Sequence, residues 1–205
     1  MKSFSHVLSV IFHPVIMVTY ATVVYFFLLP SHFGFYQTAR LWEIIGMIFT
    51  GTALIPVAAL VLLSKLGRIK SVQIEEQKER NFPLLIGSLI YFGTFYMLQN
   101  NKEVPIFILL FLLGAILGIL ISLGINLRWK ISLHMIGIGG LCGGASVVMY
   151  LQQEGNPLLI TLLFMVAGLL GTARLYLQAH TPAQIFAGFL MGFAVQSGLM
   201  LLMVR

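Results

Sequence analysis

Residues 173–192, ARLYLQAHTPAQIFAGFLMG, join two apolar runs that are each long enough to span a bilayer. Within this stretch, Arg174 and His180 lie where one run ends and the next begins. A charged side chain costs about 2.5–3.5 kcal/mol at the centre of a membrane helix and less near the interface. An ionisable residue in such a place therefore indicates a functional site. The stretch predicts a membrane bundle with a polar site at one end.

The composition indicates an integral membrane protein. Of the 205 residues, 59% are hydrophobic and only 9% are charged, whereas a soluble domain carries about 25% charged residues. The first apolar run begins too soon and is too long for a cleaved signal peptide. We predict an all-α fold, a polytopic membrane helix bundle in which residues 1–205 form a single domain. Seven transmembrane helices are expected, at about residues 7–30, 41–66, 83–99, 104–124, 132–151, 157–177 and 182–204.

Proline, glycine and cysteine positions predict how the bundle packs. Pro14 removes a helix hydrogen bond and should kink the first span. We interpret the adjacent His13 as a hydrogen-bonded structural histidine, with a ligand role as the alternative. Cys142 is the single cysteine, so neither an intrachain disulfide nor a cysteine-built metal site is expected. Glycines four residues apart allow helices to approach closely in lipid, as at Gly114 and Gly118, Gly140 and Gly144, and Gly188 and Gly192.

Basic residues gather on one face of the predicted bundle. The loops after the second, fourth and sixth spans lie on the same side as the N-terminus. This face carries nine basic residues, against three on the opposite face. The distribution favours a cytoplasmic basic face, but cations that bind phosphate would weaken that inference. The nine residues are Lys2, Lys65, Arg68, Lys70, Lys78, Arg80, Arg128, Lys130 and Arg174.

Three polar patches meet on the basic face: KERNFP around Arg80, KISLH around His134, and ARLYLQAH followed by TPAQ. Two spans are expected to begin there, at Ser132 and Pro182. Their N-termini direct partial positive charge and unpaired N–H groups toward this region, which suits an anion. The net charge of +6 fits anionic lipid or phosphate, and nothing in its pattern indicates nucleic acid. These features predict a pocket for a phosphate group carried by a lipid.

The motifs Ser132-x-His134, Arg174-x5-His180 and His180-x3-Gln184-Ile-x-Ala-Gly-x3-Gly192 resemble those of the type 2 phosphatidic acid phosphatase family. This family of integral membrane enzymes removes phosphate from lipid phosphates and isoprenyl diphosphates. Its motifs are Lys-x6-Arg-Pro, Pro-Ser-Gly-His and Ser-Arg-x5-His-x3-Asp, on a core of six helices. The resemblance covers roughly residues 80–192, and it implies a family-like catalytic core at about residues 67–204.

The resemblance implies a metal-independent reaction without a cofactor, through a phosphohistidine intermediate. His180 would be the nucleophile that attacks phosphorus. His134 would be the general acid that protonates the departing oxygen. Arg174 and Arg80 would bind the phosphoryl oxygens, and Ser132 would add a hydrogen bond.

The sequence departs from the family pattern in the first two motifs, and in the second Ile131 and Leu133 replace the proline and glycine around Ser132. Gln73 occupies the place of the first-motif lysine, for which Lys70 or Lys78 would have to substitute. The proline of that motif does not follow Arg80 directly. Lys130 and Lys78 are therefore added to the candidate substrate-binding residues.

The largest departure is Gln184, which occupies the place of the aspartate that orients the nucleophilic histidine. A neutral amide fixes the histidine tautomer but does not stabilise an imidazolium. The chain contains no aspartate at all. Gln184 also fits a helix start, because Thr181 would be the cap, Pro182 the first helical residue and Gln184 the third.

Two functions from different classes are consistent with the sequence. The first is a membrane-embedded phosphatase acting on phosphatidic acid or an isoprenyl mono- or diphosphate. The alternative is a catalytically inactive relative that binds or moves anionic lipids. A small-solute transporter is less favoured, because the ionisable residues lie at span ends rather than near the midplane. The expected partners are a phosphorylated lipid and membrane lipids, and the expected location is a bacterial cytoplasmic membrane. Family practice in bacteria places the pocket outside the cytoplasm, whereas the loop charges favour the inside.

Overall fold

The computed structural model describes residues 2–28, 38–70 and 77–204. All regular structure within these residues is helical, and seven helical segments are long and apolar enough to cross a membrane. The predicted all-α membrane bundle is therefore confirmed. The elements are α1 (Lys2–Ile11), η1 (Pro14–Ile16), α2 (Met17–Leu28), α4 (Thr38–Phe49), η2 (Thr50–Leu54), α5 (Ile55–Lys65), η3 (Gln77–Arg80), α6 (Asn81–Leu98), α7 (Ile106–Asn126), α8 (Leu133–Gln152), α9 (Pro157–Tyr176) and α10 (Pro182–Met203).

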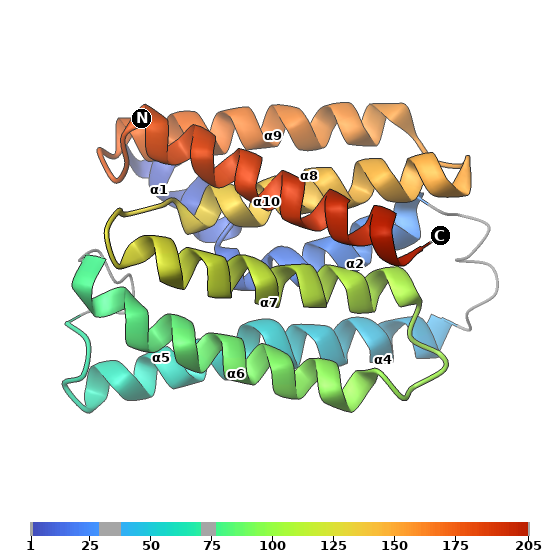
Figure 1. The fold of residues 1–205 in the computed structure, drawn as a ribbon, viewed down its shortest axis with the longest axis horizontal. Coiled ribbons are helices and arrows are strands. Elements are labelled where there is room, and N and C mark those ends of the chain that lie inside the picture. The colour runs from blue at the N-terminus through green and yellow to red at the C-terminus, as the bar shows by residue number, and fades with distance from the viewer. Residues whose placement is uncertain (1, 29–37, 71–76, 205) are drawn as a thin grey trace.

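The spans run up and down the bundle, so the chain returns to the same end after every second span (Figure 1). The N-terminus lies at the left end in Figure 1, together with the short helix η3 and the loops that precede α8 and α10. The C-terminus lies at the opposite end. We call the end that holds the N-terminus the site end, because all three candidate motifs reach it.

The first span is broken at Pro14 rather than only kinked. Helix α1 ends at Ile11, and a single turn of 3-10 helix, η1, precedes α2. The N–H of His13 donates to the carbonyl of Val10 at 3.3 Å, three residues back. In an unbroken α-helix that N–H would donate to Ser9 instead. The break therefore leaves the Ser9 carbonyl available to another donor.

The second span contains a π-helical segment, η2, which no pattern in the sequence predicts. Proline lacks a backbone N–H, so Pro56 cannot make the usual α-helical hydrogen bond to the carbonyl four residues earlier, on Thr52. The hydroxyl of Tyr91 on α6 donates to that carbonyl at 2.9 Å. The same hydroxyl lies 3.3 Å from the carbonyl of Val15 in η1. Tyr91 thus joins α6 to the irregular segments of two other spans.

Helices α8 and α10 pack backbone to backbone, because glycines line their contact. A Cβ on Gly143 would lie 2.6 Å from the carbonyl oxygen of Phe193, and one on Gly188 would lie 2.8 Å from that of Ser132. The α10 side uses the predicted pair Gly188 and Gly192. On α8 the predicted Gly140 also faces this backbone, since a Cβ there would lie 3.7 Å from the carbonyl oxygen of Gly192, and the predicted Gly144 lies against Phe111 of α7 and Gln196 of α10; the closest backbone contacts are those of Gly139 and Gly143. The close approach fixes the beginnings of α8 and α10 beside one another.

Candidate active site

A cavity of about 200 Å³ lies within the bundle and reaches its site end. Its polar lining there comes from His13, Arg80, His134, Arg174 and His180. These side chains are contributed by the first span, η3, α8, α9 and the loop before α10. The structure thus brings together four side chains that belong to three separate motifs of the sequence. The fifth, His13, belongs to no motif, and its position in the sequence favours a structural role.

His180 is buried, with 8% of its surface exposed, and its ring is held by Gln184. His180 Nδ1 lies 3.2 Å from Gln184 Oε1. That oxygen also accepts the backbone N–H of Thr181 at 3.1 Å, and the Thr181 hydroxyl accepts the backbone N–H of Gln184 at 3.4 Å. Because Gln184 Oε1 is an acceptor, Nδ1 of His180 donates to it and Nε2 keeps its lone pair. Gln184 therefore caps α10 and orients the histidine at the same time.

The surroundings of His180 keep its ring neutral. Burial lowers its pKa to about 4, and the charges of Arg80, Arg174 and Lys130 act in the same direction. The hydrogen bond with Gln184 opposes them, because it stabilises the charged ring. The imidazole is consequently unprotonated at neutral pH, which is the form that can act as a nucleophile.

Arg80 is a buried cation at the end of η3, with 7% of its surface exposed. Its Nη1 donates to the carbonyl of Ile131, just before α8, at 3.3 Å. Burial and the charge of Arg174 lower the pKa of Arg80 to about 10, so it stays charged at neutral pH. Two guanidiniums that repel one another beside a cavity favour an anion between them, because it would relieve the repulsion.

The turn that carries Arg80 is fastened to the end of α7. The side chain of Gln77 donates to the carbonyl of Asn126 at 2.7 Å, and the amide of Asn126 donates back to the carbonyl of Gln77 at 2.9 Å. The same amide donates to Asn81 Oδ1 at 2.8 Å. Asn126 is buried. This reciprocal pair, which no sequence motif indicates, holds η3 against the bundle.

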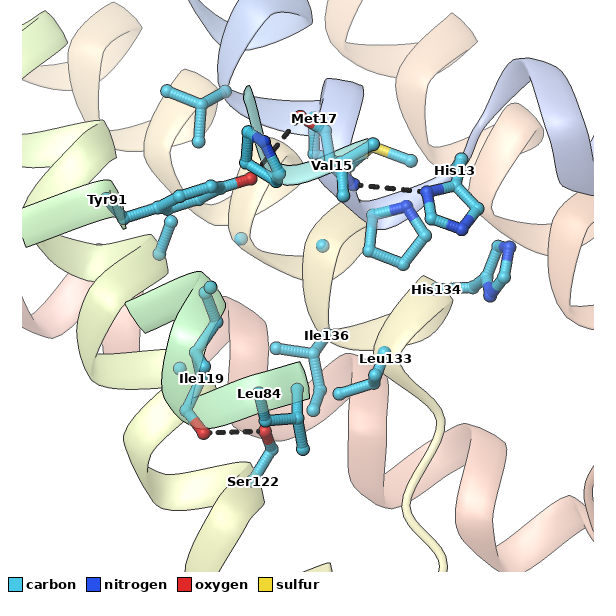
Figure 2. Close-up of a pocket in the computed structure, with 18 of the residues that line it drawn as sticks. His13, Val15, Met17, Leu84, Tyr91, Ile119, Ser122, Leu133, His134 and Ile136 are labelled. Atoms are coloured by element: carbon cyan, nitrogen blue, oxygen red, sulfur yellow. Dashed lines mark hydrogen bonds between the residues drawn. The ribbon is translucent and has the colours of Figure 1, made fainter. Parts of the chain in front are cut away.

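His134 is held by the N-terminal span. Its Nε2 lies 3.0 Å from the carbonyl oxygen of Ser9, and Arg174 Nη1 donates to the Ser9 hydroxyl at 3.3 Å. A carbonyl only accepts, so Nε2 of His134 carries the proton and Nδ1 is the nitrogen left for proton exchange. The ring of His13 contacts that of His134 edge to face, with centroids 5.5 Å apart (Figure 2). Ser9 was missed because it lies 125 positions from His134, and no local motif connects the two.

The remaining predicted residues are less directly placed. Ser132 is fully buried before α8, and its hydroxyl has no hydrogen-bond partner within the described part of the chain. It is not among the residues that line the cavity. Lys130 is half-buried and near enough to act on His180 electrostatically. The backbone of Lys78 lies in η3, but its side chain is outside the described part, and so is the whole of Gln73.

The fold and the apolar spans define the chain as an integral membrane protein of the helix-bundle class. Residues 131–205 match the family model described as the PAP2 superfamily, which confirms the resemblance over these residues and is consistent with a PAP2-type phosphatase family. The match includes His134, Arg174 and His180, whereas Arg80 and His13 lie outside it. No curated protein and no solved structure matches the chain significantly.

Proposed function

We propose that the protein is a lipid phosphate phosphatase that transfers the phosphoryl group to His180 and then to water. The observation that carries this proposal is the convergence of His180, His134, Arg174 and Arg80 on one cavity at the site end. A phosphatase-type family is supported independently by the match of residues 131–205 to the PAP2 superfamily.

The form of the cavity supports an amphiphilic substrate. Away from the charged end, its walls are mostly apolar and include Val18, Leu60, Ile90, Phe111 and Leu141. A ligand with an anionic head and a hydrocarbon chain would match both parts, since the head meets cations and the chain meets apolar side chains. A lipid monophosphate or an isoprenyl diphosphate has this character.

The first half-reaction uses the neutral form of His180. Its Nε2 attacks phosphorus while Arg174 and Arg80 bind the phosphoryl oxygens, and Lys130 adds positive charge. The bond from phosphorus to the bridging oxygen breaks, and His134, which enters this step as the imidazolium, gives its Nδ1 proton to that oxygen while its Nε2–H stays on the Ser9 carbonyl. The products are the dephosphorylated lipid, or the lipid monophosphate if the substrate is a diphosphate, and a phosphohistidine.

The second half-reaction releases inorganic phosphate. Water attacks the phosphohistidine, His134 takes a proton from that water, and the bond between Nε2 and phosphorus breaks. Gln184 acts as a positioning residue in both halves, because it holds Nδ1 of His180 and so directs Nε2 toward phosphorus. Contrary to the expectation from the sequence, the Gln184 amide also favours the positively charged ring of His180 through its hydrogen bond, but less than the charge of a carboxylate would.

The test is release of inorganic phosphate by the purified full-length chain in detergent. Phosphatidic acid, an isoprenyl monophosphate and an isoprenyl diphosphate are offered, with and without a chelator. We expect release from at least one of these lipids, unchanged by the chelator. Absence of release from all of them would contradict the proposal, and loss of release with the chelator would contradict its metal-free mechanism.

A second candidate function, binding of lipid phosphates without turnover, is favoured by Gln184 alone. Without a carboxylate beside His180, the cavity would bind lipid phosphates through Arg80 and Arg174 but turn them over too slowly to matter. Equilibrium binding of a lipid phosphate without phosphate release would support this candidate. It shares the binding end of the cavity with the first and differs only in the chemical step.

Loss of the anchor between η3 and α7 is expected to impair the site from a distance. Replacing Asn126 with leucine removes the amide that donates to Gln77 and Asn81. Because Arg80 follows directly in η3, we expect phosphate release to fall about 10-fold, mainly through a raised KM. Asn101→Leu, in the turn at the opposite end of the bundle, is the control. Equal effects of the two substitutions would contradict the positioning role of Asn126.

Removing the charge of Arg80 is expected to raise the pKa of His180. The pKa is about 4 in the native chain, and the charge of Arg80 is the second cause of the depression after burial. Without that charge, protonation of the ring is easier, so in Arg80→Met the pKa moves toward 6.5, its ordinary value. Titration of the His180 ring by nuclear magnetic resonance measures the shift. An unchanged or lower pKa in Arg80→Met would contradict the placement of Arg80 beside His180.

A further inference from the structure

The break in the first span faces the candidate site. His13 and Pro14 both line the cavity, and Ser9 contacts His134 and Arg174. The residues matched by the family model begin at 131, so the match assigns no role to this span. The N-terminal span nevertheless touches the groups on which the proposed chemistry depends.

Ser9 contacts two of the proposed functional side chains through different atoms. Its carbonyl, released by the break, accepts from His134 Nε2, and its hydroxyl accepts from Arg174 Nη1. Ser9 itself is buried. A single residue thus fixes the tautomer of the proposed general acid and the position of one guanidinium. Both contacts depend on where α1 ends.

His13 presents a donor to the same end of the cavity. Its Nδ1 accepts the backbone N–H of Val15 at 3.5 Å, which caps η1 (Figure 2). With Nδ1 used as an acceptor, the neutral ring carries its proton on Nε2. Figure 2 shows the edge of the ring opposite this bond turned toward His134. The Nε2–H of His13 therefore lies among groups proposed to handle a phosphate.

We infer that the break at His13 and Pro14 is a working part of the phosphate site, in which His13 binds a phosphoryl oxygen through Nε2–H and Ser9 positions His134 and Arg174. This inference rests on the proposed function, because it assigns the residues to the same substrate. It extends the site to a span that precedes the region matched by the family model. The ligand class is a phosphate monoester or diphosphate, or free inorganic phosphate as product.

Replacing His13 with asparagine separates binding from folding. Asparagine is a good cap and can still accept the Val15 N–H, but it lacks the distant nitrogen. We expect His13→Asn to keep native thermal stability. Its affinity for inorganic phosphate and its phosphate release at subsaturating lipid should fall about 10-fold or more. His6→Asn, an exposed histidine on the same span, is the matched control and should behave as the native chain.

Replacing Pro14 with alanine tests the role of the break. Alanine restores a backbone N–H, so the helix can continue and the N–H of His13 can return to Ser9. We expect the neutral His134 ring to lose its single Nε2–H tautomer, which is visible in the nitrogen resonances of a labelled ring. Ser9→Ala should weaken phosphate binding several-fold through Arg174, with Ser5→Ala, a buried serine one turn earlier, as its control.

The outcomes separate this inference from the proposed function. If the native chain releases phosphate but His13→Asn and Pro14→Ala match the native chain in phosphate affinity, release and tautomer, the inference is overturned and the phosphatase proposal stands. If the native chain neither binds inorganic phosphate nor releases it from lipids, the proposed function is contradicted, and the inference is overturned with it because there is no phosphate site. If the native chain binds phosphate without turnover, the loss of affinity in His13→Asn supports the inference in the inactive relative as well.

Discussion

His180→Asn is expected to reduce phosphate release at least about 10³-fold. Asparagine can still contact Gln184 from the same place, but it has no nitrogen where Nε2 of His180 would attack phosphorus. Arg174 and Arg80 are unchanged, so phosphate affinity should stay within a few-fold of that of the native chain. Release of inorganic phosphate and trapping of a phosphorylated chain by acid quench are the two measurements. Both signals should disappear together, because one step produces them.

His6→Asn serves as the control, since His6 is exposed on α1 and is not among the residues that line the cavity. Full phosphate release by His180→Asn would exclude the phosphohistidine mechanism. If that variant still formed a phosphorylated chain, a residue other than His180 would be the nucleophile. Neither result would affect the description of the fold.

Gln184→Glu is expected to raise kcat about 10- to 100-fold. Glutamate has the length of glutamine, so its carboxylate can keep both the Thr181 N–H and the His180 Nδ1–H as donors. The added negative charge stabilises the positive ring that forms when Nε2 bonds to phosphorus. It also raises the pKa of His180 from about 4, since an opposite charge favours the protonated form. The acid limb of the pH profile should move to higher pH accordingly.

The control for this gain is Gln178→Glu, which adds the same charge at an exposed position of the same loop. It should leave kcat within about two-fold, because an exposed charge is screened by solvent and salt. A fall in kcat for Gln184→Glu, or an equal rise in both variants, would contradict the orienting role of Gln184. If the native chain is inactive, a first appearance of turnover in Gln184→Glu would identify the missing charge as the cause.

The sequence was sufficient to predict the class of fold and the part of the site that contains Arg174 and His180. Long apolar runs must form helices in lipid, so the number of apolar runs predicted the number of spans. The spacing from Arg174 to His180 lies within one loop and one helix end, where sequence distance and spatial distance agree. Arg80 and His134 were brought together with His180 by the polar patches expected on the same face of the bundle, and the resemblance then assigned their roles.

The contacts of the N-terminal span could not be predicted in this way. Ser9 reaches Arg174 across 165 positions of chain, and its free carbonyl exists only because Pro14 changes the backbone nearby. On α8 the predicted Gly140 and Gly144 do face neighbouring helices, but the closest contacts with the α10 backbone are made by Gly139 and Gly143. Consecutive helix positions differ by about 100° around the axis, and composition does not reveal which of two neighbouring glycines lies closest to the partner.

The hydroxyl of Tyr91 has one proton and two carbonyl neighbours, on Val15 beside the break of the first span and on Thr52 in the π-helical segment of the second. The two spans therefore compete for a single donor, and a change in one alters how firmly the other is bound. The effects of substitutions at Pro14 and at Pro56 on the free energy of unfolding should consequently be non-additive, although the prolines belong to different spans. Through this shared phenol, a substitution at Pro56 is expected to alter how firmly η1 is held.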